Sequence, residues 1–173
     1  EYPSIKVYLP ENLYFITSQE LLDMYPDLSS KEREYEITKE HKAVFIIGIG
    51  DKLSNGQAHD GRAPDYDDWK LNGDLIYYHE VLDCALEISS MGIRVDADSL
   101  VYQLETSNHT DRMRYRYHQM ILNNELPYTI GGGIGQSRLC MLLMGKAHIG
   151  EVQSSLWDEY TLKLARENGI IIL

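Results

Sequence analysis

The sequence predicts a single α+β (mixed α/β) domain, and three observations support this class. Strand-like and helix-like hydrophobic patterns alternate along the chain, without internal repeats. Residues 75–78 and 84–89 are two apolar runs joined by a short polar segment, which predicts an antiparallel hairpin. Residues 128–144 read as a short apolar strand, a glycine-rich segment and an amphipathic helix. We therefore expect an antiparallel sheet flanked by helices.

The composition is that of a globular protein: 173 residues are 43% hydrophobic and include 13 tyrosines. The net charge of −11 disfavours nucleic acid and anionic membrane surfaces as partners. No run approaches the length of a membrane span, and no signal peptide is visible. Cys84 and Cys140 lie in apolar segments without metal-ligand spacing, which predicts reduced core residues of a cytoplasmic protein. The chain starts at Glu1 rather than Met, so we expect its true beginning to be missing.

The first fifty residues are expected to contain two helices with recognisable starts. Ser18 is a candidate cap for a short helix that ends before Pro26. Ser29 and Glu32 form a capping box that opens a charged helix to about residue 40. The expected strands in this part are residues 4–8, 13–16 and 43–47.

Residues 48–69 are expected to form a long loop, and loops of this length usually have a function. The loop concentrates charged side chains that can bind a metal, bind the charged ends of a substrate, or pair with each other. These alternatives stay open at this point. The residues concerned are His59, Asp60, Arg62, Asp65, Asp67 and Asp68.

The predicted hairpin carries a carboxylate in an unusual place. Asn72-Gly73-Asp74 is expected to be the turn that precedes its first strand. On its second strand, Glu87 lies between Leu86 and Ile88 and should point to the opposite side from both. A carboxylate there is costly unless it is paired, metal-bound or on a solvated face. The following residues 89–94 place two hydroxyls, a glycine and an arginine at a strand end, where they could hold a small polar ligand.

The remaining elements are mostly helical. Capping residues predict helices at 99–105, 112–123 and 158–168, and residues 148–153 predict a tight turn into a strand.

Residues 131–135 contain four glycines between a strand and a helix. Such a segment can turn sharply and can let a flat ligand approach the backbone. The helix N-terminus favours phosphate, and Arg138 in its first turn should point back to the same place. The Rossmann and P-loop patterns are not satisfied, which leaves a G-x-G-x-x-R pattern. It predicts a nucleotide cradle, with a simple tight turn as the alternative.

Longer segments make the chain resemble ammonia-dependent asparagine synthetases (aspartate–ammonia ligases), relatives of class II aminoacyl-tRNA synthetases. The resemblance spans nearly all of this sequence but only the C-terminal half of the family's chain. The matching segments are Phe45-Ile-Ile-Gly-Ile-Gly50, Lys52-Leu-Ser54, Arg62-Ala-Pro-Asp-Tyr-Asp-Asp-Trp69, Leu71-Asn-Gly-Asp74, Leu86-Glu-Ile-Ser-Ser-Met-Gly-Ile-Arg-Val-Asp96, Thr129-Ile-Gly-Gly-Gly-Ile-Gly-Gln-Ser-Arg-Leu139 and His148-Ile-Gly-Glu-Val-Gln153.

Two departures from the family are expected to matter. The N-terminal half, with its dimer-forming motif and an arginine loop that grips ATP, is absent from residues 1–173. The family also has several more residues where this chain has only Lys70 before Leu71, which suggests a shortened or omitted loop. The resemblance implies a homodimer formed through the missing half and an inactive isolated fragment.

The resemblance implies that aspartate attacks ATP to give β-aspartyl-AMP and pyrophosphate, and that ammonia then displaces AMP. ATP would meet Arg138, Arg62 and the glycines, while Mg²⁺ would be held by Glu87 and Asp74. Asp67 could alternatively attract ammonium or take its proton. The implied glycines are Gly132, Gly133 and Gly135; the implied aspartate-binding residues are Ser89, Ser90, Arg94 and Asp67; the implied catalytic residues are Arg138, Asp67 and Arg94.

Two other functions remain open from the sequence. A fragment of an aspartyl- or asparaginyl-tRNA synthetase would share the fold but would need a basic surface for tRNA. A non-catalytic ATP-binding relative would bind the nucleotide without making asparagine. Cys84 and Cys140 are expected in the cores of a strand and a helix, so neither looks like the nucleophile of a glutaminase.

Overall fold

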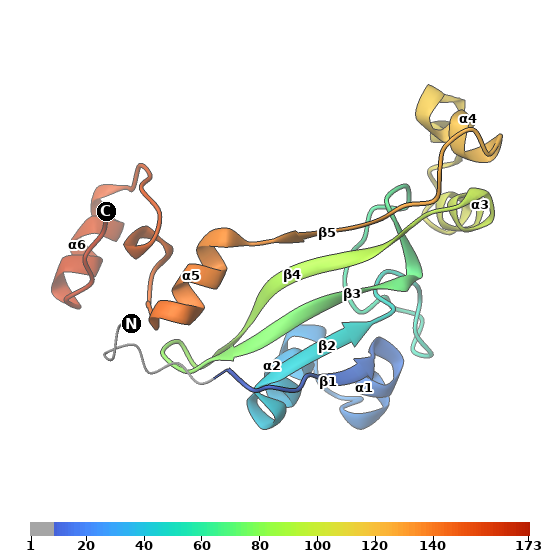
Figure 1. The fold of residues 1–173 in the computed structure, drawn as a ribbon. Helices are drawn as coiled ribbons and strands as arrows, with labels where there is room; N and C mark the ends of the chain where they lie inside the picture. Colours follow the sequence, from blue (N-terminus) through green and yellow to red (C-terminus); the bar gives the residue numbers. More distant parts are fainter. Residues whose placement is uncertain (1–8) are drawn as a thin grey trace.

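The computed structural model describes residues 9–173, so the strand expected at residues 4–8 lies outside the described residues. Its centre is a five-stranded sheet with the order β1-β2-β3-β4-β5 (Figure 1). β1 and β2 are parallel, and every other neighbouring pair is antiparallel. The predicted α+β class is confirmed, with one parallel pair in the sheet. The strands are β1 Tyr14–Thr17, β2 Ala43–Ile47, β3 Asp67–His79, β4 Cys84–Arg94 and β5 Ile130–Ile134.

The helices lie in three groups around this sheet (Figure 1). α1 and α2 lie behind the sheet in this view, α3 and α4 stand at one end, and α5 and α6 stand at the other. The expected helix over 112–123 is divided at Tyr115, and the strand expected after residues 148–153 does not form. The helices are α1 Ser18–Met24, α2 Ser30–His41, α3 Ala97–Thr106, α4 Arg116–Leu122, α5 Gln136–Met144 and α6 Glu159–Glu167, with 3₁₀ turns at Thr110–Arg114 and Ile149–Glu151.

Capping boxes start the first two helices. The box predicted for α2 is confirmed, because the Ser29 hydroxyl accepts from the backbone N–H of Glu32 and the Glu32 carboxylate accepts from that of Ser29. The predicted cap of α1 was wrong by one residue. Thr17 is the cap and pairs with Glu20, whereas the hydroxyl of Ser18 donates to the carbonyl of Gly48.

β3 is much longer than predicted and passes straight through Asn72-Gly73-Asp74. Asn72 is buried, and its side-chain amide donates to the carbonyl of Ile49 over 2.7 Å and accepts from the Ile49 N–H over 2.8 Å. Gly73 lies flat against Phe45, where an added Cβ would be 2.5 Å from a ring carbon. The residues that suggested a turn are therefore packing and hydrogen-bonding residues inside a strand. Lys70 and Leu71, where a shortened or omitted loop was expected, are adjacent residues of β3.

The glycine-rich segment also differs from the prediction of a turn. Gly131, Gly132 and Gly133 are strand residues of β5 and pair with Gly92, Met91 and Ser90 of β4. None of the glycines at 131–135 has a positive φ. Because Gly131 and Gly132 lack a Cβ, side chains of β4 can lie close to the backbone of β5. A Cβ on Gly131 would be 2.4 Å from the Arg94 guanidinium, and one on Gly132 would be 2.7 Å from the Met91 side chain.

The main core lies between the sheet and the two helices behind it. Branched side chains of α1 and α2 pack against the adjoining strands, and a second cluster joins α3 and α4. α5 was expected to bury Leu139, Leu142 and Leu143; in the structure Met141 and Leu142 are buried, whereas Leu143 is 37% exposed. The first cluster contains Ile16, Leu21, Ile37, Val44, Ile46, Ile49 and Ile76.

Both cysteines are free, as predicted, but neither is a core residue. Cys84 is half-buried at the start of β4, and Cys140 is exposed on α5. Burial raises the pKa of the Cys84 thiol, as does the neighbouring Asp83 carboxylate. Among the described residues, no helix combines the length and the apolar character needed to cross a membrane.

Candidate active site

Strand pairing brings polar residues of β3, β4 and β5 onto one side of the sheet. Asp74 is opposite Ser90, and Ser90 is opposite Gly133. Directly opposed residues have their side chains on the same side. We call this side the polar face; it carries Asp74, Glu87, Ser90 and Arg94. The other side, the apolar face, carries Phe45, Leu75, Met91, Ile130 and Ile134.

A β-bulge in β4 decides which face receives Glu87. The register moves from Leu75 opposite Ser89 to Ile76 opposite Glu87, which leaves Ile88 as the extra residue. In a regular ladder, Glu87 would be opposite Tyr77 and would point to the apolar face. The bulge places Glu87 with Ile76 and hence with Asp74 on the polar face. The alternation of side chains along β4, read from the sequence alone, does not predict that Glu87 shares a face with Asp74.

Asp74 is the most deeply buried carboxylate of the polar face after Asp67, with 5% of the residue exposed. One of its oxygens accepts a hydrogen bond from the guanidinium of Arg62, which reaches it from the loop before β3. The other oxygen, Oδ1, is buried and has no hydrogen-bond partner among the described residues. Buried carboxylate oxygens are normally paired, so this one marks an open position for a ligand.

Arg138 meets Glu87 at the junction of β5 and α5. The helix is held against β4 because the N–H of Gly135 donates to the carbonyl of Ile88 over 2.8 Å. Arg138 Nη1 donates to the backbone carbonyl of Glu87 over 3.1 Å and lies 3.8 Å from its carboxylate oxygen Oε1. Both side chains remain partly exposed. A loose, solvent-accessible pair of this kind can open toward an anionic ligand without leaving a buried charge unpaired.

Asp67 and Arg94 form a second, tighter pair at the other end of the polar face. Arg94 donates to the Asp67 carboxylate and, over 2.9 Å, to the hydroxyl of Tyr66, whose ring centre is 3.8 Å from the guanidinium carbon. Burial opposes the charged form, but the hydrogen bond and charge of Asp67 outweigh it and raise the pKa of Arg94. Glycines make room for the pair: Gly131 lies under Arg94, and a Cβ on Gly92 would be 2.9 Å from Asp67 Cγ.

Gln103 supports this pair and was missed by the sequence analysis. It is 1% exposed on α3. Its Nε2 donates to the carbonyls of Pro64, over 2.9 Å, and Asp67, over 3.1 Å, while its Oε1 accepts from the N–H of Trp69 over 2.7 Å. The available signal was its place beside Leu104, three residues after Leu100, on the buried stripe of a predicted helix. A polar residue on such a stripe needs buried partners.

The other charged residues of the loop mostly pair with neighbouring elements. Asp60 is 3.1 Å from Lys31 of α2, and Asp65 is 3.1 Å from Arg112 and 3.0 Å from His118. Burial would raise the pKa of Asp65, but the hydrogen bonds from His118 and Arg112 dominate and lower it. In the part of the chain that is described, no group of three or more His, Cys, Asp or Glu side chains is placed so that they alone could hold a metal ion.

His59 of the same loop is turned inward. Its Nε2 lies 3.0 Å from a carboxylate oxygen of Glu34 on α2, so it pins the loop to that helix. Of the functions considered for this charged segment, His59 therefore shows pairing with another side chain. Of the charged residues expected in the loop, Arg62 and Asp67, the first residue of β3, reach the polar face.

Two residues grouped with the site by sequence lie on the opposite side of the sheet. Ser89 is opposite Leu75 and is buried, whereas its neighbour Ser90 is opposite Asp74. Gly132 is opposite Met91 and faces the same way as Ser89. Adjacent strand residues point to opposite faces, so the polar face receives Ser90 and Gly133 but neither Ser89 nor Gly132.

The sequence matches one protein family along nearly its whole length. A family model described as "Aspartate-ammonia ligase" matches residues 1–169. Curated relatives named aspartate–ammonia ligase include one from Ligilactobacillus salivarius, 62% identical over the whole chain and 52% of its own length. Another, from Ruminiclostridium cellulolyticum, is 58% identical over 99% of the chain and 51% of its own length. The chain thus spans about half the length of the curated relatives it matches.

Solved structures share the fold at low sequence identity. Asparaginyl-tRNA synthetase of Entamoeba histolytica, in complex with asparaginyl-adenylate, has a TM-score of 0.58 and 20% identity, over 87% of this chain and 36% of the synthetase. The corresponding enzyme of Pyrococcus horikoshii has a TM-score of 0.52 and 17% identity, over 81% of this chain and 34% of the synthetase. The fold is therefore that of class II aminoacyl-tRNA synthetases, and the family model places the sequence more closely: the chain belongs to the aspartate–ammonia ligase family.

Proposed function

We propose that this chain provides part of the active site of an enzyme that makes L-asparagine from L-aspartate, ammonia and ATP. The reaction would pass through β-aspartyl-AMP and release AMP and pyrophosphate. Family membership and the names of the relatives support the overall reaction. The observation that carries the site is the unpaired, buried Asp74 Oδ1 on the same face as Glu87 and Arg138.

The chemistry requires positioning more than proton transfer. A carboxylate is a poor acceptor for ammonia at neutral pH, because it must first gain a good leaving group. The site must therefore neutralise a polyphosphate and hold the attacking oxygen in line with the α-phosphorus. Fixed charges on a rigid sheet suit this task.

ATP would lie over β5 and the start of α5. A Cβ built on Gly133 meets nothing within 4 Å, so the backbone beside Ser90 is open on the polar face. Arg138 would turn from Glu87 toward the nucleotide. A Cβ added at Gly135 would make only ordinary contact with the aliphatic part of that side chain, 3.4 Å from Arg138 Cδ. Arg62, which is held by Asp74, would contribute positive charge near the phosphates.

Two of the carboxylates of the polar face, Asp74 and Glu87, fit a magnesium ion. Mg²⁺ binds through one or two protein carboxylates together with phosphate oxygens, and when bound it neutralises phosphate charge. Asp74 and Glu87 are available on one face, and Asp74 Oδ1 has no other partner among the described residues. These two residues would hold the ion; Arg62 keeps the second oxygen of Asp74 in place.

Aspartate would bind toward Arg94 and Asp67, next to Ser90. Arg94 would meet a carboxylate of the substrate and Asp67 its amino group. Asp67 could alternatively attract ammonium or accept its proton. Tyr66 and Gln103 hold the pair by hydrogen bonds and Gly92 leaves room for Asp67, so the geometry of the pair is set before the substrate arrives.

The test is product analysis on this chain joined to the remaining half of the Ligilactobacillus salivarius relative. We expect continuous release of AMP and pyrophosphate only when aspartate and ammonia are both present, because without ammonia each site can release only the one pyrophosphate that leaves when the adenylate forms. Release of ADP would contradict the adenylate mechanism. Arg138→Ala should abolish adenylate formation, while Arg166→Ala on α6 serves as a control. Nucleotide binding without asparagine synthesis would identify a non-catalytic relative, and charging of tRNA would identify a synthetase fragment.

The 173 residues alone should show no appreciable synthesis, since half of the relatives' length is not matched. Homodimer formation through that half and a cytoplasmic location complete the proposal.

A further inference from the structure

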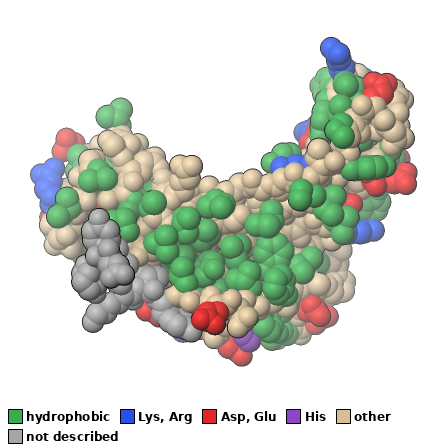
Figure 2. Space-filling model, viewed as in Figure 1, with side chains coloured by type: hydrophobic (Ala, Val, Ile, Leu, Met, Phe, Trp, Pro, Cys, Tyr) green, Lys and Arg blue, Asp and Glu red, His purple; other side chains and the backbone are tan. Residues whose placement is uncertain are grey.

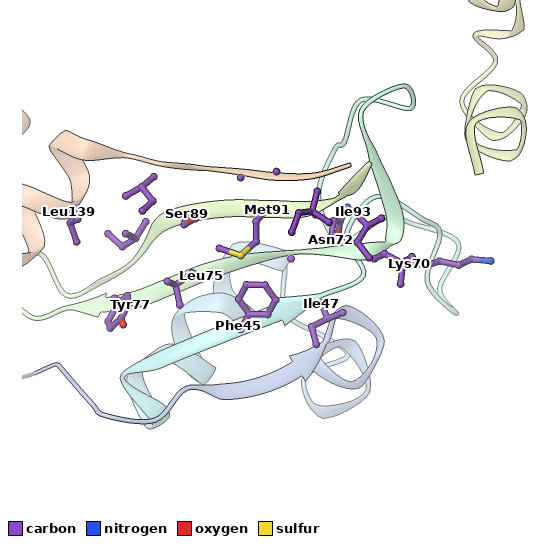
Figure 3. A pocket seen from close by; sticks show the side chains of 18 of the residues that line it. Phe45, Ile47, Lys70, Asn72, Leu75, Tyr77, Ser89, Met91, Ile93 and Leu139 are labelled. Carbon is purple, nitrogen blue, oxygen red and sulfur yellow. The ribbon is translucent and has the colours of Figure 1, made fainter. Parts of the chain in front are cut away.

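The apolar face of the sheet forms a groove of about 780 Å³ that no described helix covers. Its lining comes from β2, β3, β4 and β5, from Leu9 before β1, and from Leu139 and Leu142 of α5. Leu139 lies at one end of the groove (Figure 3). Lys70 is the one charged residue of the lining, and its amine points away from the groove. The groove therefore offers no charges with which to recognise a polar ligand.

The exposed part of this face is too apolar for an ordinary protein surface. Figure 2 shows a continuous area of hydrophobic side chains over the centre of the sheet. Ile130 is 79% exposed and Ile134 is 61% exposed, and both belong to the wall made by β5. Contiguous apolar patches of this kind mark surfaces that another protein segment covers.

The shape of the face argues against a second copy as the covering partner. The apolar side chains line a groove rather than a bulge, and they face the viewer in Figure 2, below the tan edge formed by β5. A two-fold dimer needs a self-complementary surface, and two hollow surfaces do not fit each other. Each copy would also bring a net charge of −11. A convex partner is required.

The lengths of the curated relatives indicate which segment covers the groove. Only about half of their length matches this chain, so the other half must pack somewhere. On the opposite side of the sheet, α1 and α2 already cover the strands near β1, and the rest of that side is the polar face. The apolar groove is the remaining large hydrophobic surface of the sheet among the described residues.

We propose that the groove is the docking surface for the half of the ligase that this chain does not match, and that a helical layer with a convex apolar side fills it. Helices are the usual cover for an apolar sheet face. Ser89 supports a specific fit: it is 4% exposed on this face, and its hydroxyl has no partner among the described residues. That hydroxyl would pair with a polar group of the docked half.

Cysteine accessibility tests the proposal without requiring activity. Ile130→Cys and Ile171→Cys form a matched pair, because the two isoleucines are 79% and 77% exposed and only Ile130 lines the groove. In the 173-residue chain, a maleimide should label both at similar rates, followed by mass spectrometry of the peptides. When the unmatched half of the Ligilactobacillus salivarius relative is joined to the chain, Ile130→Cys should react at least about tenfold more slowly. Ile171→Cys should be unchanged.

The same pair, changed to aspartate, provides an independent check. Ile130→Asp should lower the melting temperature of the joined protein but hardly that of the chain alone, since the charge is buried only when the groove is filled. Ile171→Asp should affect neither. Equal labelling of both cysteines in the joined protein would overturn the proposal. So would a dimer of the 173-residue chain that protects Ile130→Cys, because the occupant would then be a second copy.

Discussion

The two faces of the central sheet are built from alternate residues of the same strands, yet they serve different purposes. Asp74 and Ser90 point to one side, while Leu75 and Met91, the next residue of each strand, point to the other. On the polar face the side chains are charged and held by hydrogen bonds. On the apolar face they are hydrophobic, and no described helix covers them. The period of two in a strand lets one segment carry both chemistry and packing.

Gly73 on the apolar face and Gly133 on the polar face differ in the space around them, and this difference gives the largest expected effect. Gly73 packs against Phe45 and a backbone oxygen, so Gly73→Val has no room on the apolar face. We expect a loss of about 3 kcal/mol or more in the free energy of unfolding, measured by urea denaturation. A change below about 0.5 kcal/mol would show that the strand can shift and that the close contact is unimportant.

Removing the buried support of the polar face should have the next largest effect. Gln103→Ala leaves two buried carbonyls and one N–H without their partner. The expected loss in unfolding free energy is about 2–3 kcal/mol. Gln119→Ala is the control, since the one hydrogen bond made by that exposed side chain should be worth about 1 kcal/mol or less. Equal losses for the two variants would contradict a special role for Gln103.

The Asp65 pair should make stability depend on acid. The pKa of Asp65 is lowered in the folded state, so the unfolded state binds this proton more readily. The contribution is complete above the ordinary aspartate pKa of about 4 and disappears as the pH falls through the lower, folded value. Melting temperatures measured between about pH 6 and pH 3 should therefore fall less steeply for Asp65→Asn than for the unchanged chain. Parallel curves would show that the pair is not stabilising.

Gly133→Val should change stability least and would sharpen the comparison with Gly73. An added Cβ meets nothing within 4 Å, so the unfolding free energy should stay within about 0.5 kcal/mol. Calorimetry on the joined protein should nevertheless show loss of ATP binding, because the valine occupies the proposed nucleotide space beside Ser90. Unchanged ATP binding would place the nucleotide elsewhere.

The sequence predicted the types of element well but misjudged their ends. The capping box at Ser29 and the apolar run at residues 43–47 are local signals, and the structure confirms both. Asn72-Gly73-Asp74 and Gly131–Gly133 were interpreted as turns, because glycine and asparagine are common there. In the structure they are strand residues, since tertiary contacts with Ile49, Phe45 and Met91 require a small side chain or an amide.

The candidate site shows the same division at the level of single residues. The chemistry of Asp74, Glu87 and Arg138 was visible in the sequence, and the resemblance to a known family gave these residues roles. The sequence did not show that Ser89 and Gly132 lie on the opposite face from these residues, because adjacent positions in a sequence carry no information about which face of the sheet they occupy. Gln103 was missed because its partners are backbone groups about 35 positions away, and no local sequence pattern predicts such contacts.

The sequence by itself therefore determined the α+β class, the family and the residue types that the proposed adenylate chemistry needs, because caps, periodicity and motifs are local in the chain. Only the tertiary structure decided which residues share a face. The extra residue Ile88 in β4 turns Glu87 toward Asp74, and side-chain collisions require glycine beneath Arg94 and Met91. These outcomes depend on register and on contacts between distant segments, and a one-residue shift in register exchanges the two faces of a strand.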